Sequence, residues 1–177
     1  MDTGLLLLRI VVGLLLVGHG AQKLFGWFGG GGLAGTAWFF RSAGYWPPRL
    51  MARSAGSAEL VAGAALALGF ATPLAAAAVI GTMLNAAAVY RRNGLWAVDN
   101  GYEYPLVLGT VAAALGFTGA GAVSFDAWLG FGAGSIETGL FAVALGLVTG
   151  SAVLFSRAAA RSEAGPAAES PIEKVAA

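Results

Sequence analysis

The sequence predicts an all-α membrane protein, in which a four-helix transmembrane bundle is followed by a fifth, C-terminal transmembrane helix. Hydrophobic residues make up 58% of the 177 residues and charged residues only 11%, whereas about 25% of an ordinary soluble domain is charged. Several apolar runs reach the length of about 20 residues that a helix needs to cross a bilayer. Ten basic and nine acidic residues cannot cover a soluble surface, which excludes an ordinary soluble enzyme, a disordered chain and a nucleic-acid-binding protein.

The first expected span covers residues 4–28 and ends at four consecutive glycines, residues 29–32. A cleavable signal peptide would begin with a basic segment, but Asp2 stands there and Arg9 interrupts the apolar run. We therefore expect this segment to be a helix that is retained in the protein.

The next apolar segment is long enough for two helices. Residues 54–90 contain a single charged residue, Glu59. At about 1.5 Å per residue, this segment is too long for one span and suits two. Pro73 divides it, because proline fits the first turn of a new helix. The expected helices are therefore 55–71 and 73–90.

The fourth expected helix, 104–117, begins near a Tyr-Pro pair, and a further transmembrane helix occupies the segment 131–157, where Arg157 ends it. The remaining residues, 158–177, are rich in Ala, Pro and Glu, which predicts a disordered cytoplasmic tail. Residues 1–130 would then form the main membrane domain.

Between the first and second spans, residues 33–53 combine aromatic residues with arginines. This pattern is typical of the headgroup boundary of a bilayer. We expect a short interfacial helix that extends to Gly44, followed by a turn at Pro47-Pro48. The alternative is an ordinary loop packed on the bundle.

The distribution of Lys and Arg predicts the orientation, because cytoplasmic flanks carry an excess of these residues. With five spans, nine of the ten basic residues fall on one side, and Arg9 is the exception. The expected topology is multi-pass, with the N-terminus out and the C-terminus in. The nine residues are Lys23, Arg41, Arg49, Arg53, Arg91, Arg92, Arg157, Arg161 and Lys174.

The polar residues expected inside the membrane gather in the cytoplasmic half of the bundle. Ionisable residues at such depths cost free energy and are functional candidates. Helical spacing of three and four residues places the first three of them on one face. The candidates are His19, Gln22 and Lys23 in the first helix, Glu59 in the second, Asn85 in the third, and Glu103 and Tyr104 at the start of the fourth.

Arg9 is the one basic residue in the outer half of the bundle. Depth along a helix follows from a rise of about 1.5 Å per residue, and Glu137 lies about as far into the fifth helix from the outside. We expect the two to form a structural ion pair, because an unpaired charge in the membrane is costly.

One interpretation of the cytoplasmic cluster is a quinone site. A quinone needs a flat apolar slot, a donor for each carbonyl oxygen, and a proton route when it is reduced. The expected roles are hydrogen-bond donation by His19, Gln22 or Lys23, contact with the ring or slot by Trp27, Phe25, Tyr104 and Asn85, and proton transfer by His19, Glu59 and Glu103.

The second interpretation is a structural polar cluster that holds the helices together, and we favour it for most of the individual residues. Lys23 would pair with Glu103 or Glu59, while His19 and Asn85 would bridge helices. Polar contacts between transmembrane helices contribute about 0.6 kcal/mol each. No metal site is expected, because the chain has one His and no Cys.

Several segments form an ordered set of motifs: Leu8-Arg9, HGAQKLFGWFGGGG at 19–32, Glu59 with LVAGAALALGFATPLAA after it, GYEYP at 101–105, and Ser124-Phe125-Asp126. Over about residues 4–130 this set resembles the DoxX family of small bacterial membrane proteins. The resemblance implies a four-helix DoxX-like bundle in the bacterial plasma (inner) membrane. It also implies that the chain is related to membrane subunits of oxidoreductases, including those of enzymes that carry out quinone-linked thiosulfate oxidation. The fifth helix departs from that pattern.

The expected function is therefore a membrane subunit or anchor of an oxidoreductase complex, with a quinone as the expected cofactor and a redox protein as partner. Without Cys, the chain does not form a complete electron-transfer enzyme alone. The alternatives are a non-catalytic scaffold or assembly protein and, less favoured, a small-solute transporter. A cavity that reaches His19 and Glu59 would separate them, since a scaffold needs none. Gly146 and Gly150 form a GxxxG motif, which marks helix packing or a homo-oligomer contact.

Overall fold

The computed structural model describes residues 2–131 and 133–163, and these residues form an all-helical fold without strands. Short 3-10 turns lie at Trp27–Gly29, Arg91–Asn93 and Ala97–Asp99. The α-helices are α1 (Asp2–Phe25), α2 (Gly32–Ser42), α3 (Pro48–Leu68), α4 (Thr72–Tyr90), α5 (Glu103–Thr118), α6 (Phe125–Trp128) and α7 (Ile136–Glu163).

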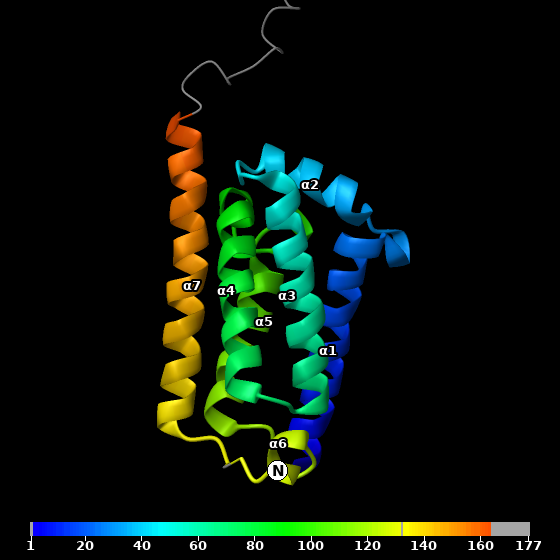
Figure 1. Cartoon of the computed structure of the whole chain (residues 1–177), viewed down its shortest axis with the longest axis vertical. Coiled ribbons are helices and arrows are strands. Elements are labelled where there is room, and N and C mark those ends of the chain that lie inside the picture. The colour runs from blue at the N-terminus through cyan, green and yellow to red at the C-terminus, as the bar shows by residue number, and fades with distance from the viewer. Residues whose placement is uncertain (1, 132, 164–177) are drawn as a thin grey trace, which may run out of the picture.

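The five longest helices run along the long axis of the molecule, and the chain reverses direction between consecutive ones (Figure 1). Helix α2 lies across one end of the bundle, here called the α2 end, and α6 lies at the other end beside the N-terminus, here called the α6 end. Helix α1 packs along α3, while α4 packs against α3, α5 and α7. Helix α7 is thus joined to the bundle through α4 and α5.

Within the described residues, three helical segments are long and apolar enough to cross a membrane: Asp2–Phe25, Thr72–Asn93 and Ile136–Ala159. Helix α5 is also apolar but has only 16 residues. Helix α3 has 21 residues but carries Arg49, Arg53 and Glu59, which lower its hydropathy. The helical, membrane-type architecture follows directly from these segments.

Glycines allow two pairs of helices to approach closely. A Cβ atom on Gly13 would lie 2.5 Å from the carbonyl oxygen of Gly63, so α1 and α3 meet nearly backbone to backbone. On the other side, a Cβ on Gly146 would lie 2.7 Å from the Ala77 carbonyl oxygen, and one on Gly150 would lie 2.9 Å from that of Gly81. The GxxxG motif of α7 therefore packs against α4 within the chain.

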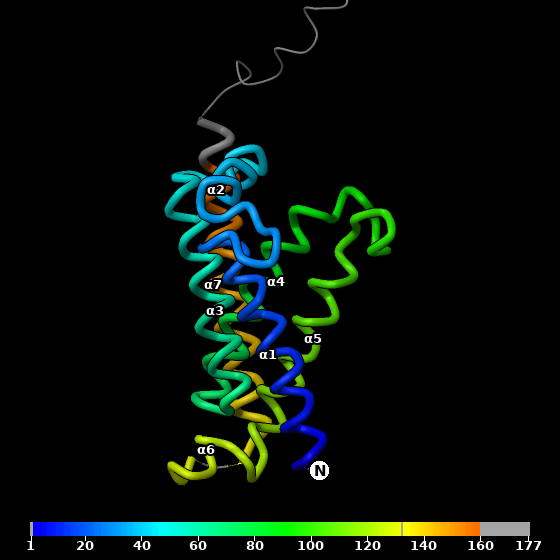
Figure 2. Tube along the Cα trace, turned by 90° about the vertical axis from the view of Figure 1, so that its right-hand side faces the viewer, coloured from blue at the N-terminus to red at the C-terminus, as the bar shows by residue number. Residues whose placement is uncertain are grey.

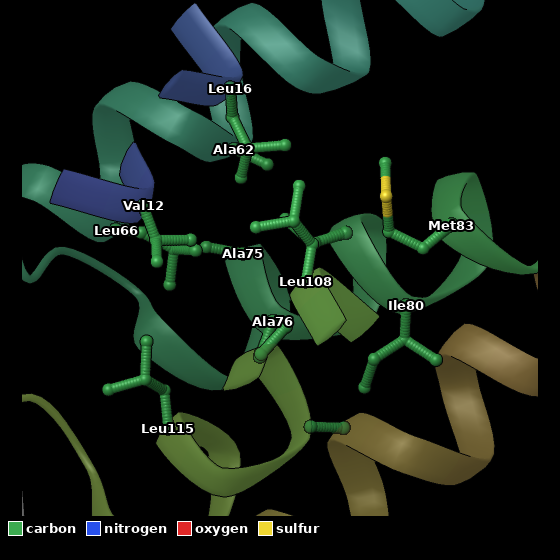
Figure 3. Packing of buried hydrophobic residues seen from close by; sticks show 13 residues of the cluster. Val12, Leu16, Ala62, Leu66, Ala75, Ala76, Ile80, Met83, Leu108 and Leu115 are labelled. Carbon is green, nitrogen blue, oxygen red and sulfur yellow. The ribbon is translucent and has the colours of Figure 1, made fainter. Parts of the chain in front are cut away.

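The positions of its residues along the helices place the hydrophobic core in the middle of the bundle and its α6-end half. Figure 3 shows the packing of these side chains. Mostly small and branched side chains from α1, α3, α4, α5 and α7 interdigitate there. The core residues are Val12, Leu16, Ala62, Leu66, Ala75, Ala76, Val79, Ile80, Met83, Leu108, Ala112, Leu115 and Ala142.

Arg9 is fully buried near the α6 end. Its Nη2 group donates a hydrogen bond to the Val123 carbonyl oxygen at 2.6 Å, and it interacts electrostatically with Asp126. The expected pairing with Glu137 is wrong, because Glu137 is exposed in the first turn of α7. Helix α7 packs on α4 and α5, so a residue at matching depth on α7 is not a neighbour of α1.

Asp126 organises the turn that faces Arg9. Its Oδ1 atom accepts a hydrogen bond from the Ala71 backbone N–H at 2.7 Å, and its Oδ2 atom accepts one from the Thr72 N–H at 3.0 Å. The carboxylate therefore satisfies backbone donors at the start of α4, where a negative charge also suits the helix dipole. Gly69, with φ 65°, allows the guanidinium group of Arg9 to pack directly against the backbone.

Several helix boundaries differ from those predicted, including the end of α3 at Leu68 rather than 71 and the start of α7 at Ile136 rather than 131. Helix α1 ends at Phe25 rather than 28, because Gly26 takes a left-handed conformation (φ 76°). Helix α3 begins at Pro48 rather than 55, since proline starts the helix and the arginines that follow lie exposed. Helix α7 continues to Glu163, so the first residues of the expected tail are helical, and residues 164–177 lie outside the described residues.

Candidate functional site

A cavity of about 610 Å³ lies in the α2-end half of the bundle. The packed core closes it toward the α6 end, since Leu16 and Met83 belong both to the core and to the cavity wall. It forms because small residues face inward where larger ones would fill the space. These residues are Ala55, Ala58, Ala78, Gly81 and Ala86.

An ion pair between α1 and α3 forms the most polar part of the cavity wall. Lys23 Nζ lies 2.5 Å from Glu59 Oε2. The side chain of Lys23 is 27% exposed and that of Glu59 only 5%. The close packing of α1 on α3 brings the two together, and the structure selects Glu59 rather than Glu103 as the partner of Lys23.

His19 and Tyr104 meet across the cavity wall between α1 and α5. Their ring centroids are 5.2 Å apart, with 58° between the ring planes. His19 lies one turn before Lys23 on the same face of α1, as the spacing predicted. Tyr104 lines the cavity and is 39% exposed.

Asn85 joins three elements at the α7 side of the cavity. Its Nδ2 group donates hydrogen bonds of 3.0 Å to the carbonyl oxygens of Gly81 and of Gly150 in α7. Its Oδ1 atom accepts a hydrogen bond from the Tyr45 hydroxyl at 3.1 Å. Asn85 thus bridges helices, as the structural interpretation of the cluster expected.

Tyr45 is a buried residue of this site that the sequence interpretation assigned to the membrane interface. The guanidinium carbon of Arg157 lies 4.8 Å from the centre of its ring, and Arg157 Nε donates to the Ala43 carbonyl oxygen at 2.8 Å. These contacts fix the end of α7 against the α2–α3 turn. The residues Thr149, Gly150 and Val153 of α7 consequently line the cavity.

Aromatic residues of α2 and α4 cover the α2 end of the cavity, and sequence reasoning missed this role as well. Phe39 stacks on Tyr90, with centroids 6.5 Å apart and 26° between the planes. The ring centroids of Phe40 and Tyr45 are 5.1 Å apart. The run Trp38-Phe39-Phe40 was the available signal, but a helical period alone does not say which of its members face the lipid.

Four predicted site residues lie outside the cavity wall: Glu103, Gln22, Trp27 and Phe25, of which Phe25 is exposed. Glu103 Oε2 accepts a hydrogen bond from the Ala97 backbone N–H at 2.8 Å, which stabilises the loop before α5. Gln22 Nε2 donates to the Phe28 carbonyl oxygen at 3.4 Å, and Trp27 is exposed. The site therefore retains His19, Lys23, Glu59, Asn85 and Tyr104 of the predicted set.

The chemistry of the cavity suits a flat, mainly apolar ligand with polar atoms at its edge. Its walls are mostly Ala, Leu, Met, Val and aromatic side chains, and its polar groups converge from α1, α3, α4 and α5. Ligand pockets commonly combine apolar walls with a few placed polar groups, and they commonly have volumes of about 300–1,000 Å³.

Comparison with known proteins identifies the chain by its N-terminal half. A family model for DoxX matches residues 4–92, which is half of the 177 residues. The matched region contains α1 to α4 and the Lys23–Glu59 pair. It stops before the motifs at 101–105 and 124–126. No curated protein and no solved structure matches the chain.

Proposed function

Because the chain belongs to the DoxX family of membrane proteins, we propose that it is a membrane subunit of a redox complex and that its cavity binds a quinone-type ligand. The observation that carries this proposal is the cavity of about 610 Å³ that reaches both His19 and Glu59. A scaffold whose polar residues only join helices would be expected to fill this space with side chains, as interiors normally are.

Access from the bilayer favours a lipid-soluble ligand. The first turns of α5 and the loop before it lean away from α1 (Figure 2). In the cavity wall, the His19–Tyr104 ring contact spans the two helices. A ligand dissolved in lipid reaches the His19–Tyr104 contact without crossing water. A water-soluble polar substrate would first have to enter the apolar bilayer.

The proposed roles follow from the donors and acceptors around the cavity. His19, Lys23 and the Tyr104 hydroxyl donate to the carbonyl oxygens of the ring. Reduction of a quinone to a quinol takes two electrons and two protons, and Glu59 is the carboxyl group placed to exchange protons with the ring. The electrons come from a redox partner protein, because no side chain of the cavity supplies them.

A binding experiment tests the cavity directly. We expect purified protein to bind a short-chain quinone, and Ala58→Trp to weaken the affinity at least about tenfold, which is about 1.4 kcal/mol, because the indole fills the space lined by Ala58. Val61→Trp is the matched control, since Val61 is exposed on the outer surface of α3. Equal affinities of the wild type and Ala58→Trp would refute the assignment.

We also propose that α1, α3, α4, α5 and α7 all cross a bacterial inner membrane, with the N-terminus out and the C-terminus in. This topology puts the α2 end in the cytoplasm, which agrees with the positive-inside rule. Basic residues at that end include Lys23, Arg41, Arg49, Arg53, Arg91, Arg92 and Arg157.

Cysteine labelling tests the topology, because the natural chain has no Cys. In intact cells we expect Ser162→Cys to resist a membrane-impermeant thiol reagent, and Val123→Cys, exposed at the α6 end, to react with it. Permeabilised cells should label both positions. The reverse pattern in intact cells would overturn the orientation.

A further inference from the structure

The α2 end carries exposed arginines that the fold does not use. Among the described residues, the one ion pair joins Lys23 to Glu59, and none of these arginines has a side-chain hydrogen bond. Like charges without counter-charges repel one another, and an anionic ligand that binds to them relieves this repulsion. The five side chains are those of Arg41, Arg49, Arg53, Arg91 and Arg92.

Three of these arginines lie in the segments on either side of the connection from α2 to α3. Arg41 lies in the last turn of α2. Arg49 and Arg53 lie four residues apart in the first turns of α3, so they share one exposed face. Since α2 packs on α3, the three form a basic surface, here called the α2–α3 corner.

Exposed aromatic and aliphatic side chains are interleaved with these charges. Trp38, 74% exposed, lies three residues before Arg41 on the outer face of α2, and Trp46 and Leu50 are exposed on either side of Arg49. Tryptophan beside arginine is the composition of the membrane–water boundary, where an indole contacts both headgroups and acyl chains. A nucleic acid or an acidic protein would not require Leu50 at such a position.

We propose that the α2–α3 corner binds the phosphodiester headgroup of an anionic phospholipid. The planar guanidinium groups of Arg41, Arg49 and Arg53 present paired N–H donors that match phosphate oxygens. None of the described carboxylates of this end pairs with these three arginines: Glu59 is paired with Lys23, Glu103 accepts from the Ala97 N–H, and Asp99 lies in the separate loop before α5. Each basic residue near an anionic surface strengthens the attraction, so three of them select for such lipids.

The test measures lipid binding to the full-length protein in a neutral detergent by native mass spectrometry. Phosphatidylglycerol and phosphatidylcholine with identical acyl chains are titrated in parallel. We expect phosphatidylglycerol to bind at least about tenfold more tightly to the wild type, and Arg41→Gln/Arg49→Gln/Arg53→Gln to lose this preference. The matched control, Arg91→Gln/Arg92→Gln, removes charge from the same end outside the corner and should retain affinity within about threefold.

Three results would overturn the proposal: equal affinity of the wild type for both lipids, equal losses in the triple variant and the control, or displacement of the lipid by millimolar inorganic phosphate. The last result would identify a free-phosphate site. The wild-type comparison stands on its own if the triple variant does not fold. Because the corner lies outside the cavity wall, loss of lipid preference leaves quinone binding unaffected, so the two proposals fail independently.

Discussion

Replacement of Lys23 by methionine is expected to lower the free energy of unfolding by about 3 kcal/mol, because it leaves a buried carboxylate without its partner. Glu59 is only 5% exposed, and its carboxylate accepts a hydrogen bond from Lys23 Nζ. Methionine retains the apolar stem of the lysine, so the loss reports the charge rather than the packing. Unfolding of the purified protein in mild detergent measures the change.

The double variant Lys23→Met/Glu59→Gln separates the pair from its surroundings. Removal of both charges also removes the desolvation cost of the buried carboxylate, so we expect the double variant to be more stable than Lys23→Met alone. Quinone affinity should fall in the double variant even though stability recovers, because the cavity has lost a donor and a carboxyl group. If the double variant loses as much stability as Lys23→Met and Glu59→Gln lose separately, added together, the two side chains do not interact.

Asp126→Ala is expected to cost at least about 3 kcal/mol, although Asp126 lies at the end of the bundle remote from the cavity. The substitution leaves the backbone N–H groups of Ala71 and Thr72 without acceptors, and each buried unsatisfied donor costs about 1–3 kcal/mol. It also removes the anionic group nearest to the buried guanidinium of Arg9.

Asp126→Asn distinguishes the two contributions, since an amide oxygen still accepts a hydrogen bond but carries no charge. We expect its loss of stability to be about half of that of Asp126→Ala. Ser124→Ala is the local control: its hydroxyl accepts from the Ala127 N–H at the start of α6, and the loss of such a cap costs about 1 kcal/mol. If Asp126→Ala costs no more than Ser124→Ala, the Arg9–Asp126 contact does not stabilise the fold.

Positions along the axis of the bundle could be predicted from the sequence, because helix rise converts residue number into distance along a helix. Lys23 and Glu59 were expected in the same half of the bundle, and they form an ion pair. The same reasoning failed for Arg9 and Glu137, and it did not decide between Glu103 and Glu59 as the partner of Lys23. Depth does not determine which helices are neighbours, and α1 packs on α3 rather than on α7.

Helix ends were predictable where a proline or glycine fixes the backbone. Pro73 marks the start of α4, but the start of α3 at Pro48 was placed too late. The arginines of its first turns led us to include them in the interfacial segment 33–53, whereas the helix accommodates them because their side chains lie exposed.

The cavity itself could not be predicted from the sequence. It depends on how α5 leans away from α1. It also depends on the side chains of Phe39, Phe40 and Tyr90, which cover the α2 end of the cavity. The sequence shows small residues at Ala55, Ala58 and Gly81, but small residues equally permit close packing, as at Gly13 and Gly63. The packing of neighbouring helices decides between these outcomes.

The most direct measurement of the central proposal is identification of the small molecules that remain bound when the protein is purified from its own bacterial membrane. Mild detergent, organic extraction and mass spectrometry would be applied to the wild type, Ala58→Trp and Val61→Trp in parallel. We predict a quinone in the wild type and in Val61→Trp, up to one molecule per chain, and its loss from Ala58→Trp. A wild-type protein that is folded and binds neither native quinone nor added quinone would contradict the account.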